Sequence, residues 1–344
     1  MMNTAWQEFL VSQGARFDEA MVDKTLRDFG APADELLAAR DATVLAPLTH
    51  LALLECAGAD AQNFLHNQLT SDVNHLSVDG AQYSAWCTAK GRMLASFLLY
   101  RQEEKYYVLL SSDLLSTTQK RLQSFVLRAK VTLTELSEQH VLLGIAGAQA
   151  ELALQQAGLR VPPHPMTTTR FDNSQLIRLD TTRFLLVVEN SQAENLWKTL
   201  AQTARPVGSP AWIWLDIQAK IPLITAATQE NLVPQMANFD KIGGVSFNKG
   251  CYPGQEIVAR AQYLGKVKRH LYQLRATSAV APGDSIYAPD DLEHPCGIIV
   301  NAAPSPDGGF AALAVLQESL AETTDLCVIS GGLSTEVSAV QLVD

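Results

Sequence analysis

The sequence predicts an α+β protein that ends in a small all-β barrel, and two patterns carry this prediction. Up to about residue 270, antiparallel strand patterns alternate with amphipathic helices, which is typical of α+β layers and not of a doubly wound parallel sheet. Beyond that point the helical pattern disappears, and six short apolar segments follow one another, separated by turn residues. The 344 residues are 47% hydrophobic, which is enough for two or three compact domains.

Residues 1–42 are predicted to be a helical segment peripheral to the main fold. Thr4 and Gln7 have the spacing of a capping box. The apolar residues that follow recur at helical spacing and would form a buried stripe (Trp6, Phe9 and Leu10). A second helix is predicted after Pro32, over residues 34–39.

Strands and helices alternate between residues 43 and 269. A strand starting near His50 would end at the turn 58–60. A helix broken at Gly80 would follow, and its apolar face would be Phe64, Leu65, Leu69, Val73 and Leu76. Further strands are predicted at 82–88, 93–101, 105–111, 131–135, 140–145 and 184–188. Further helices are predicted at 114–127, at 148–157, after 188 with Ser191 and Glu194 as caps, and at 211–220 as a helix or turn.

Residues 270–344 are predicted to form the barrel. Its strands would be the segments 271–275, 284–288, 297–302, 310–316, 326–330 and 336–342. Asp307-Gly308-Gly309 is a strong signal for a hairpin turn between the third and fourth of these strands. Strands of this length and spacing are typical of a small barrel or sandwich.

Composition excludes several classes of function. The chain has 26 Lys+Arg against 36 Asp+Glu, and a net charge of −10 is poorly suited to coating nucleic acid non-specifically. The five cysteines are widely spaced and include no Cys-x-x-Cys pair, which indicates a reducing compartment without a disulfide framework. We find no signal peptide and no apolar run long enough to cross a bilayer. We therefore expect a cytoplasmic protein that makes no direct contact with a membrane.

Residues 249–256, Lys-Gly-Cys-Tyr-Pro-Gly-Gln-Glu, combine features that favour chemistry at one sulfur. Gly250 allows a ligand to approach the backbone beside Cys251, or allows a positive φ. Pro253-Gly254 predicts a tight turn that would hold the cysteine on a rigid loop. Lys249, with Arg260 further along, supplies positive charge that favours the thiolate over the thiol.

A helix predicted from Gln255 would place its N-terminus near the cysteine and stabilise an anion there. The competing interpretation is a buried apolar cysteine in a turn, because free cysteine is among the most buried residue types. Residue chemistry alone leaves these two interpretations balanced for Cys251. The other cysteines lie in apolar, strand-like surroundings and are predicted to be core residues (Cys56, Cys87, Cys296 and Cys327).

The stretch from Lys241 to His270 is basic in an otherwise acidic chain. It contains six basic residues (241, 249, 260, 266, 268 and 269) and one acidic residue (256). Such a cluster suits a polyglutamate tail or an RNA phosphate, and a solvated positive face is the alternative. The seven histidines show no metal-ligand spacing, and no phosphate-binding glycine motif occurs.

The segment 249–256 resembles the signature K-G-C-Y-x-G-Q-E of the YgfZ family, relatives of the aminomethyltransferase (T-protein) of the glycine cleavage system. The match continues upstream through 234–235, Asn238 and 243–247, and downstream through 256–260. A second matching block runs from 58–60 through 69–73 to 90–92. Together these blocks cover the chain from about residue 48 to residue 270.

This resemblance implies a GcvT-like folate-binding fold, with a ring-like arrangement of domains and a small C-terminal barrel. Residues 43–269 would be the folate-binding region, built from two intertwined α+β subdomains, one of them at about 61–130. The implied cofactor is tetrahydrofolate or a derivative. Trp212 stands where the family places a tryptophan against the folate, although a core tryptophan is equally consistent with the sequence. Gln218 replaces a family glutamate that binds the pterin, and Arg260 is the third residue assigned to the cofactor.

Two departures from the family and its relatives bear on activity. T-protein enzymes resemble one another in a Gly-Gly-x-x-Asp-Asp segment, and here Ala95-Ser96 stands in place of the acidic pair. A reaction that needs those carboxylates is therefore disfavoured, so we do not expect an aminomethyltransferase of the usual kind. Leu51 stands where some relatives have a second tryptophan in the pocket.

The resemblance implies a folate-binding accessory protein for the assembly or repair of iron–sulfur proteins, which supports tRNA modification indirectly. Cys251 would act as a thiolate that transiently holds iron, persulfide sulfur or a cluster fragment, and Lys249 would tune it. The rest of the motif would shape the loop (Gly250, Tyr252, Gly254, Gln255 and Glu256). The expected partners are iron–sulfur client or assembly proteins. The alternatives are a tetrahydrofolate-dependent aminomethyltransferase-like enzyme and a non-catalytic scaffold that binds RNA or protein through residues 241–270.

Overall fold

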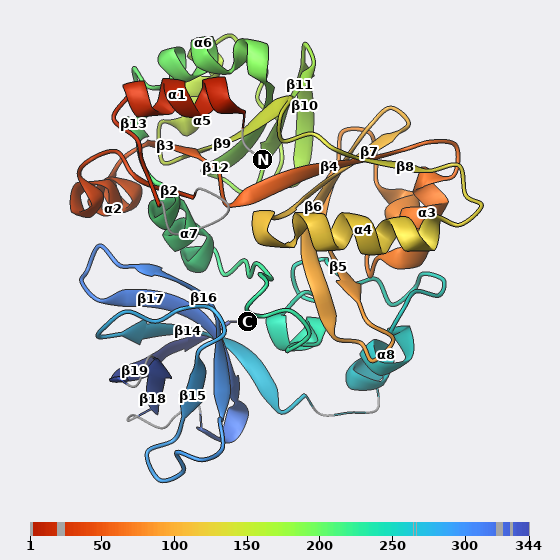
Figure 1. Ribbon diagram of the computed structural model, residues 1–344, viewed down its shortest axis with the longest axis vertical. Coiled ribbons are helices and arrows are strands. Elements are labelled where there is room, and N and C mark those ends of the chain that lie inside the picture. Colours follow the sequence, from red (N-terminus) through yellow and green to blue (C-terminus); the bar gives the residue numbers. More distant parts are fainter. Residues whose placement is uncertain are drawn as a thin grey trace. The chain divides into compact units, whose positions relative to one another are not determined.

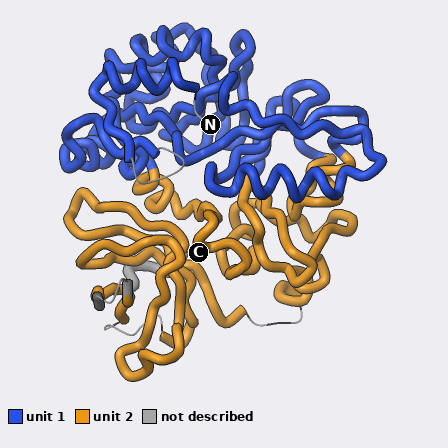
Figure 2. Tube along the Cα trace, in the orientation of Figure 1, with its two compact units in different colours: residues 1–62, 75–82, 98–212 blue, residues 63–74, 83–97, 213–344 orange. Residues whose placement is uncertain are grey.

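The computed structural model describes residues 3–18, 25–263, 265, 267–320, 326–330 and 333–343. The chain forms two compact units, each assembled from segments that are distant in sequence (Figure 2). Unit 1 comprises residues 1–62, 75–82 and 98–212, and unit 2 comprises residues 63–74, 83–97 and 213–344. The predicted domain boundaries at residues 42 and 269 stay predictions.

A six-stranded sheet in the order β10-β11-β12-β9-β3-β13 organises unit 1 (Figure 1). Its strands are β3 (Val44–Pro47), β9 (His140–Ala146), β10 (Thr167–Phe171), β11 (Ser174–Arg178), β12 (Arg183–Glu189) and β13 (Arg205–Pro206). Neighbouring strands are antiparallel except for β13 and β3, which are parallel. Helices α1 (Thr4–Ser12), α5 (Ala150–Gln156) and α6 (Asn190–Leu200) contribute to one hydrophobic core with this sheet, in which Trp6, Leu10 and Trp197 are buried.

Both predicted N-terminal helices form, but the predicted capping box of the first one is wrong. Asn3 is the N-cap of α1, and its side chain accepts a hydrogen bond from the Trp6 backbone N–H. Thr4 is already inside the helix, and asparagine is favoured over threonine at an N-cap. The second helix, α2, spans Pro32–Asp41, so it begins at the proline and is longer than the predicted range 34–39. Strand β1 (Arg16–Phe17) pairs with β2 (Leu26–Asp28).

A five-stranded sheet has the order β5-β6-β7-β4-β8. Its strands are β4 (Leu51–Ala57), β5 (Ala81–Cys87), β6 (Met93–Gln102), β7 (Lys105–Ser111) and β8 (Thr132–Glu135). All five were predicted within two residues at each end. The 3₁₀ turn η2 (Ser112–Leu114) precedes helix α4 (Leu115–Val126), which lies within the predicted range 114–127 and buries Leu115, Thr118, Leu122 and Val126.

The helix predicted to run to Gly80 is shorter than expected. Helix α3 spans Ala61–Gln68, and only the 3₁₀ turn η1 (Val73–His75) follows it. Beyond Gln68 the backbone pairs with β5: the Thr70 N–H donates to the Ala85 carbonyl at 2.9 Å. The five predicted apolar residues are all buried. Helix α3 places the first two, and the chain after the helix places Leu69, Val73 and Leu76.

Two further helices flank the segment that carries the sequence motif. Helix α7 (Ser209–Gln218) precedes it, and helix α8 (Gln255–Tyr263) begins directly after the predicted turn (Figure 1). The 3₁₀ turn η3 (Pro234–Ala237) lies between them. Among the helices of the described segments, none has the length and hydropathy that a bilayer crossing requires.

The six C-terminal strands close into a barrel in the order β14-β17-β16-β15-β18-β19, coloured blue in Figure 1. They are β14 (Arg269–Ala276), β15 (Ser285–Tyr287), β16 (Gly297–Pro304), β17 (Phe310–Gln317), β18 (Leu326–Ser330) and β19 (Leu333–Leu342), with the 3₁₀ turn η4 (Glu318–Leu320) after β17. All six predicted strands form, and the predicted hairpin joins β16 to β17, with Gly308 and Gly309 at positive φ. The mixture of helices, antiparallel sheets and a closed barrel confirms the predicted fold class.

Six strands were not predicted, and the predicted caps of helix α6 are wrong. Four of them have only two to four residues each (β1, β2, β3 and β13), and β10 (Thr-Thr-Thr-Arg-Phe) has no apolar alternation. Strand β11 is the sixth. Helix α6 begins at Asn190 after Glu189, and no side chain caps it. Ser191 and Glu194 therefore do not cap this helix, and Glu194 instead pairs with Lys198 one turn later.

Candidate functional site

Residues 249–255, the cysteine loop, end in the tight turn that the sequence predicts. The Gln255 N–H donates to the Tyr252 carbonyl at 3.1 Å, which closes a four-residue turn over Pro253 and Gly254. Gly254 has a φ of 81°, as the third position of a type II turn requires. A methyl group on Gly254 would lie 2.4 Å from the Thr88 carbonyl oxygen, so the turn rests directly on neighbouring backbone.

The thiol of Cys251 is exposed to solvent, whereas Cys56, Cys87 and Cys296 are buried and Cys327 is half-buried. Burial raises the pKa of Cys56 and of Cys87 to about 12, and it also raises the pKa of Cys296. The buried thiols are therefore kept protonated and out of contact with reagents. Of the two interpretations of Cys251, its exposure supports the functional one.

Neither the backbone conformation nor the packing around Gly250 requires a glycine at this position. Its φ is outside the left-handed region, so the predicted alternative of a positive φ is wrong. A methyl group on Gly250 would meet only Nε2 of His66, at 4.0 Å, which is an ordinary van der Waals contact. The backbone at Gly250 is therefore open on the side where a Cβ would lie.

Lys249 is buried, with 8% of its side chain exposed. Its ammonium group donates to the backbone carbonyls of His66, Leu69 (2.5 Å) and Ser71 (3.0 Å). It also lies 5.0 Å from the centre of the Tyr252 ring. Burial lowers the pKa of Lys249 to about 8, and the Asp72 carboxylate acts in the opposite direction. Because the three N–H donors are bound to carbonyls, the ammonium has no donor left for the thiol.

Of the other motif residues, some support the loop from within and some lie on the protein surface. Tyr252 is buried, and burial raises the pKa of its hydroxyl well above the usual value. The Gln255 side chain reaches back to the Lys249 carbonyl at 3.5 Å. Glu256 and Arg260 are exposed on helix α8, so neither is held in place by a core.

Within unit 2 the structure brings the two blocks of matching sequence together. The Thr70 hydroxyl donates to the Gly244 carbonyl at 2.6 Å, and the Ser246 N–H donates to the Thr70 carbonyl at 2.9 Å. The Gln235 side chain donates to the Val258 carbonyl of helix α8 at 2.7 Å. Sequence analysis assigned no role to Thr70, although it lies inside the matching block.

The two residues predicted to face a pterin lie in different units. Trp212 belongs to unit 1 and is 1% exposed, and a methyl group on Gly144 would lie 2.4 Å from its ring. This tight packing on a glycine supports the alternative of a core tryptophan. Gln218 belongs to unit 2 and is exposed, and its side-chain oxygen accepts a hydrogen bond from Gln273 at 3.1 Å.

Ala95 and Ser96, at the position of the missing acidic pair, are both buried in unit 2. The Ser96 hydroxyl accepts a hydrogen bond from the Ile224 N–H at 2.8 Å, so it serves a structural purpose. Among the described residues, no group of three His, Cys, Asp or Glu side chains could hold a metal ion.

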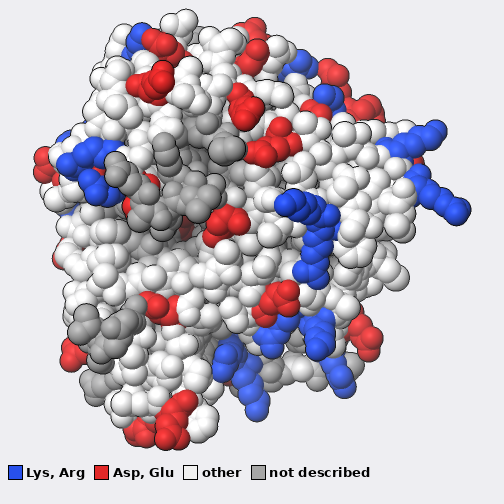
Figure 3. Space-filling model, in the orientation of Figure 1, with Lys and Arg blue, Asp and Glu red and all other residues white. Residues whose placement is uncertain are grey.

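The basic stretch 241–270 is less exposed than its sequence suggests. Lys241, Arg260 and Lys268 are exposed and Lys249 is buried, while Lys266 lies outside the described residues. Figure 3 shows Lys and Arg side chains gathered below the centre of the drawn face, in the region where Figure 1 places α8 and the start of β14. Acidic side chains are scattered over the rest of that face.

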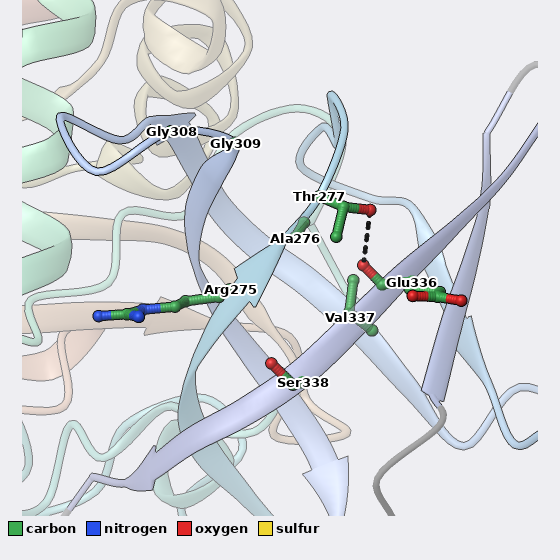
Figure 4. A pocket seen from close by; sticks show the side chains of 8 residues that line it. All are labelled: Arg275, Ala276, Thr277, Gly308, Gly309, Glu336, Val337 and Ser338. Atoms are coloured by element: carbon green, nitrogen blue, oxygen red, sulfur yellow. Dashed lines mark hydrogen bonds between the residues drawn. The ribbon is translucent and has the colours of Figure 1, made fainter.

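The barrel carries a groove of about 490 Å³ that sequence analysis did not predict (Figure 4). It is lined by Arg275, Ala276, Thr277, Gly308, Gly309, Glu336, Val337 and Ser338. The Thr277 hydroxyl donates to the Glu336 carbonyl at 3.5 Å, while the side chains of Arg275 and Glu336 point in opposite directions. None of the residues predicted from the motif lines this groove.

Comparison with known proteins agrees with this architecture. The model of the GCVT N-terminal domain family matches residues 6–241. The tRNA-modifying protein YgfZ of Yersinia pestis (strain Pestoides F) is 35% identical over 300 residues, which are 85% of this chain and 89% of that protein. The tRNA-modifying protein YgfZ of Edwardsiella ictaluri is 33% identical over 289 residues, which are 80% of this chain and 86% of that protein.

Among solved structures, the glycine cleavage system aminomethyltransferase T from Bartonella henselae superimposes with a TM-score of 0.83. The superposition covers 98% of this chain and 96% of that one, at 18% identity, and it therefore shows a shared fold. With a matching family model over most of its length and relatives above 30% identity, the chain belongs to the YgfZ family and has the GcvT-like fold.

Proposed function

We propose that this protein is a folate-binding accessory factor for the assembly or repair of iron–sulfur proteins, and that it supports tRNA modification indirectly through Cys251. The observation that carries the proposal is the exposed Cys251 thiol on a tight-turn loop, in a chain whose other described cysteines are buried or half-buried. The names of the YgfZ relatives support the link to tRNA modification, and the GcvT-like fold supports the link to folate.

A single exposed thiolate is suited to a transient role. A stable iron–sulfur cluster usually needs four protein ligands, and one cysteine supplies one. Cys251 would therefore take iron, persulfide sulfur or a cluster fragment as a substrate and pass it to an iron–sulfur client or assembly protein. Gly250 leaves the backbone beside the thiol open, so a ligand bound to the sulfur meets no side chain at that position.

The residues present fit a folate only in part. Gln218 is exposed, and although its oxygen already accepts from Gln273, a carbonyl oxygen has a second lone pair for a pterin N–H. Trp212 is packed as a core side chain, so we assign it no stacking role. When bound, tetrahydrofolate would supply a carrier for one-carbon units. The residues of this chain would hold it in place, with Gln218 as the acceptor for the pterin.

The test is genetic complementation in a bacterium whose own YgfZ gene is deleted, with the modified nucleosides of tRNA measured by mass spectrometry. Cys251→Ser should fail to restore them while the protein accumulates normally. Cys296→Ser is the matched control, because that thiol is buried, and it should restore them. A fully active Cys251→Ser variant would refute the proposal.

An RNA-binding scaffold is a second candidate, favoured by the exposed side chains of Lys241, Arg260 and Lys268. It predicts affinity for tRNA that falls steeply as salt is added and that survives the loss of Cys251. An aminomethyltransferase-like activity is disfavoured, because buried Ala95 and the hydrogen-bonded Ser96 leave no carboxylate at that position.

A further inference from the structure

The end of helix α3 presents three backbone carbonyls to a single point in unit 2. The carbonyl of His66 belongs to the last turn of the helix, and those of Leu69 and Ser71 belong to the turn that follows. Carbonyls at a helix C-terminus lack partners within the helix and carry the negative end of the helix dipole. A cation placed there is favoured, and a buried carbonyl without a donor is costly.

The ammonium of Lys249 meets this requirement in both number and shape. It has three N–H donors in tetrahedral directions, and each of the three carbonyls accepts one of them. The Tyr252 ring lies on another side of the same ammonium, at 5.0 Å. Lys249 thus joins the first residue of the cysteine loop to the α3 turn over a sequence separation of about 180 residues.

We propose that Lys249 is a positioning residue: its ammonium fixes the cysteine loop to the carbonyls of residues 66, 69 and 71, and it acts on Cys251 through the backbone and not through its charge. This assignment rests on the proposed role of Cys251 and names how that thiol is held. It replaces the expectation that Lys249 favours the thiolate directly.

Charge and shape can be separated by two substitutions at this position. Lys249→Met keeps the length of the side chain and removes the donors. Lys249→Arg keeps the charge, but a planar guanidinium cannot direct three N–H groups to the same three carbonyls. Lys268→Met is the matched control, because Lys268 is an exposed lysine outside the loop.

Two measurements on the purified proteins decide between the roles. The first is amide hydrogen exchange in the peptide covering residues 66–71, where the Leu69 and Thr70 N–H groups are bonded to backbone carbonyls. The second is the pH profile of Cys251 alkylation by iodoacetamide. Neither measurement involves folate, iron or a client protein, so its outcome is separate from the complementation result that tests the proposed function.

If Lys249 positions the loop, exchange at residues 66–71 becomes at least tenfold faster in both Lys249→Met and Lys249→Arg, and the midpoint of the alkylation profile stays the same. The Lys268→Met control should match the parent in both measurements. The proposal is overturned if Lys249→Arg behaves as the parent does. It is also overturned if Lys249→Met moves the midpoint to higher pH while exchange is unchanged, because that pattern is expected of charge alone.

A measurement on the unmodified protein covers the case in which neither variant folds. A water-soluble acetylating reagent should modify Lys249 at least tenfold more slowly than Lys268, because the bonded ammonium must leave its carbonyls before it can react. Acetylation of Lys249 as fast as that of Lys268 would show that the ammonium is not held, and it would overturn the proposal.

Discussion

Replacing each of two glycines of the cysteine loop by alanine is predicted to change the stability of the protein by very different amounts. At Gly254 the φ of 81° is a left-handed conformation, which costs a non-glycine residue about 1–2 kcal/mol. The added methyl would also lie 2.4 Å from the Thr88 carbonyl oxygen and 2.7 Å from the Gly91 backbone, and such overpacking costs about 1–3 kcal/mol. Gly254→Ala should therefore destabilise the protein by about 2–5 kcal/mol.

At Gly250 neither cost applies. The new methyl would meet only the His66 ring at 4.0 Å, and alanine restricts the unfolded chain, which stabilises a folded protein by about 0.4–1 kcal/mol. We expect the stability of Gly250→Ala to stay within about 1 kcal/mol of the parent. If the open backbone at Gly250 serves a ligand, this variant should nevertheless fail to complement the deletion strain.

Urea unfolding followed by circular dichroism measures both variants under the same conditions. The midpoint for Gly254→Ala should fall clearly below that of the parent, while the midpoint for Gly250→Ala should stay close to it. Equal losses at the two positions, or a larger loss at Gly250, would refute the assignment of Gly254 as the structural glycine of the loop.

Two further predictions concern buried polar groups. Burial lowers the pKa of His50 to about 4 from 6.5, so the unfolded chain binds more protons than the folded one as pH falls through this window, and up to about 3 kcal/mol of the stability present above pH 6.5 is lost. The urea midpoints at pH 7 and pH 4.5 should therefore differ less in His50→Leu than in the parent. The exposed control His164→Asn should behave as the parent does. The Asn301 side chain accepts a hydrogen bond from the Leu223 N–H and donates one to the Leu223 carbonyl, both at 2.9 Å. Asn301→Ala should therefore lower the free energy of unfolding, measured in urea, by about 1–3 kcal/mol. An unchanged urea midpoint would contradict this pairing.

The sequence predicted the fold best where short apolar segments are separated by turn residues. The barrel strands have this pattern, so all six were found. Gly308-Gly309 marked a hairpin because positive φ at both residues favours glycine. Strand β10 was missed because its threonines do not show which face is buried. Helix α3 was predicted too long, because a turn can bury Leu69 and Val73 as well as a helix can.

The candidate site was predictable to the extent that it depends on residue chemistry. Cys251 and the turn at Pro253-Gly254 are visible in the sequence, since glycine and proline have specific backbone roles there. The partners of Lys249 were not visible, because they are backbone carbonyls that every residue type carries. The burial of Trp212 against Gly144 was also hidden, since the contact joins residues far apart in the chain.

The central claim is that the loop exposes the Cys251 thiol, while the fold buries the thiols of Cys56, Cys87 and Cys296. A brief pulse of iodoacetamide on the folded protein at pH 8, followed by mass spectrometry of the peptides, tests it most directly. Cys251 should carry far more label than Cys56 or Cys87, because thiols with a pKa of about 12 have only about one ten-thousandth of their population as thiolate at that pH. A native protein in which Cys251 stays unlabelled, or is labelled no faster than Cys56 or Cys87, would contradict the account.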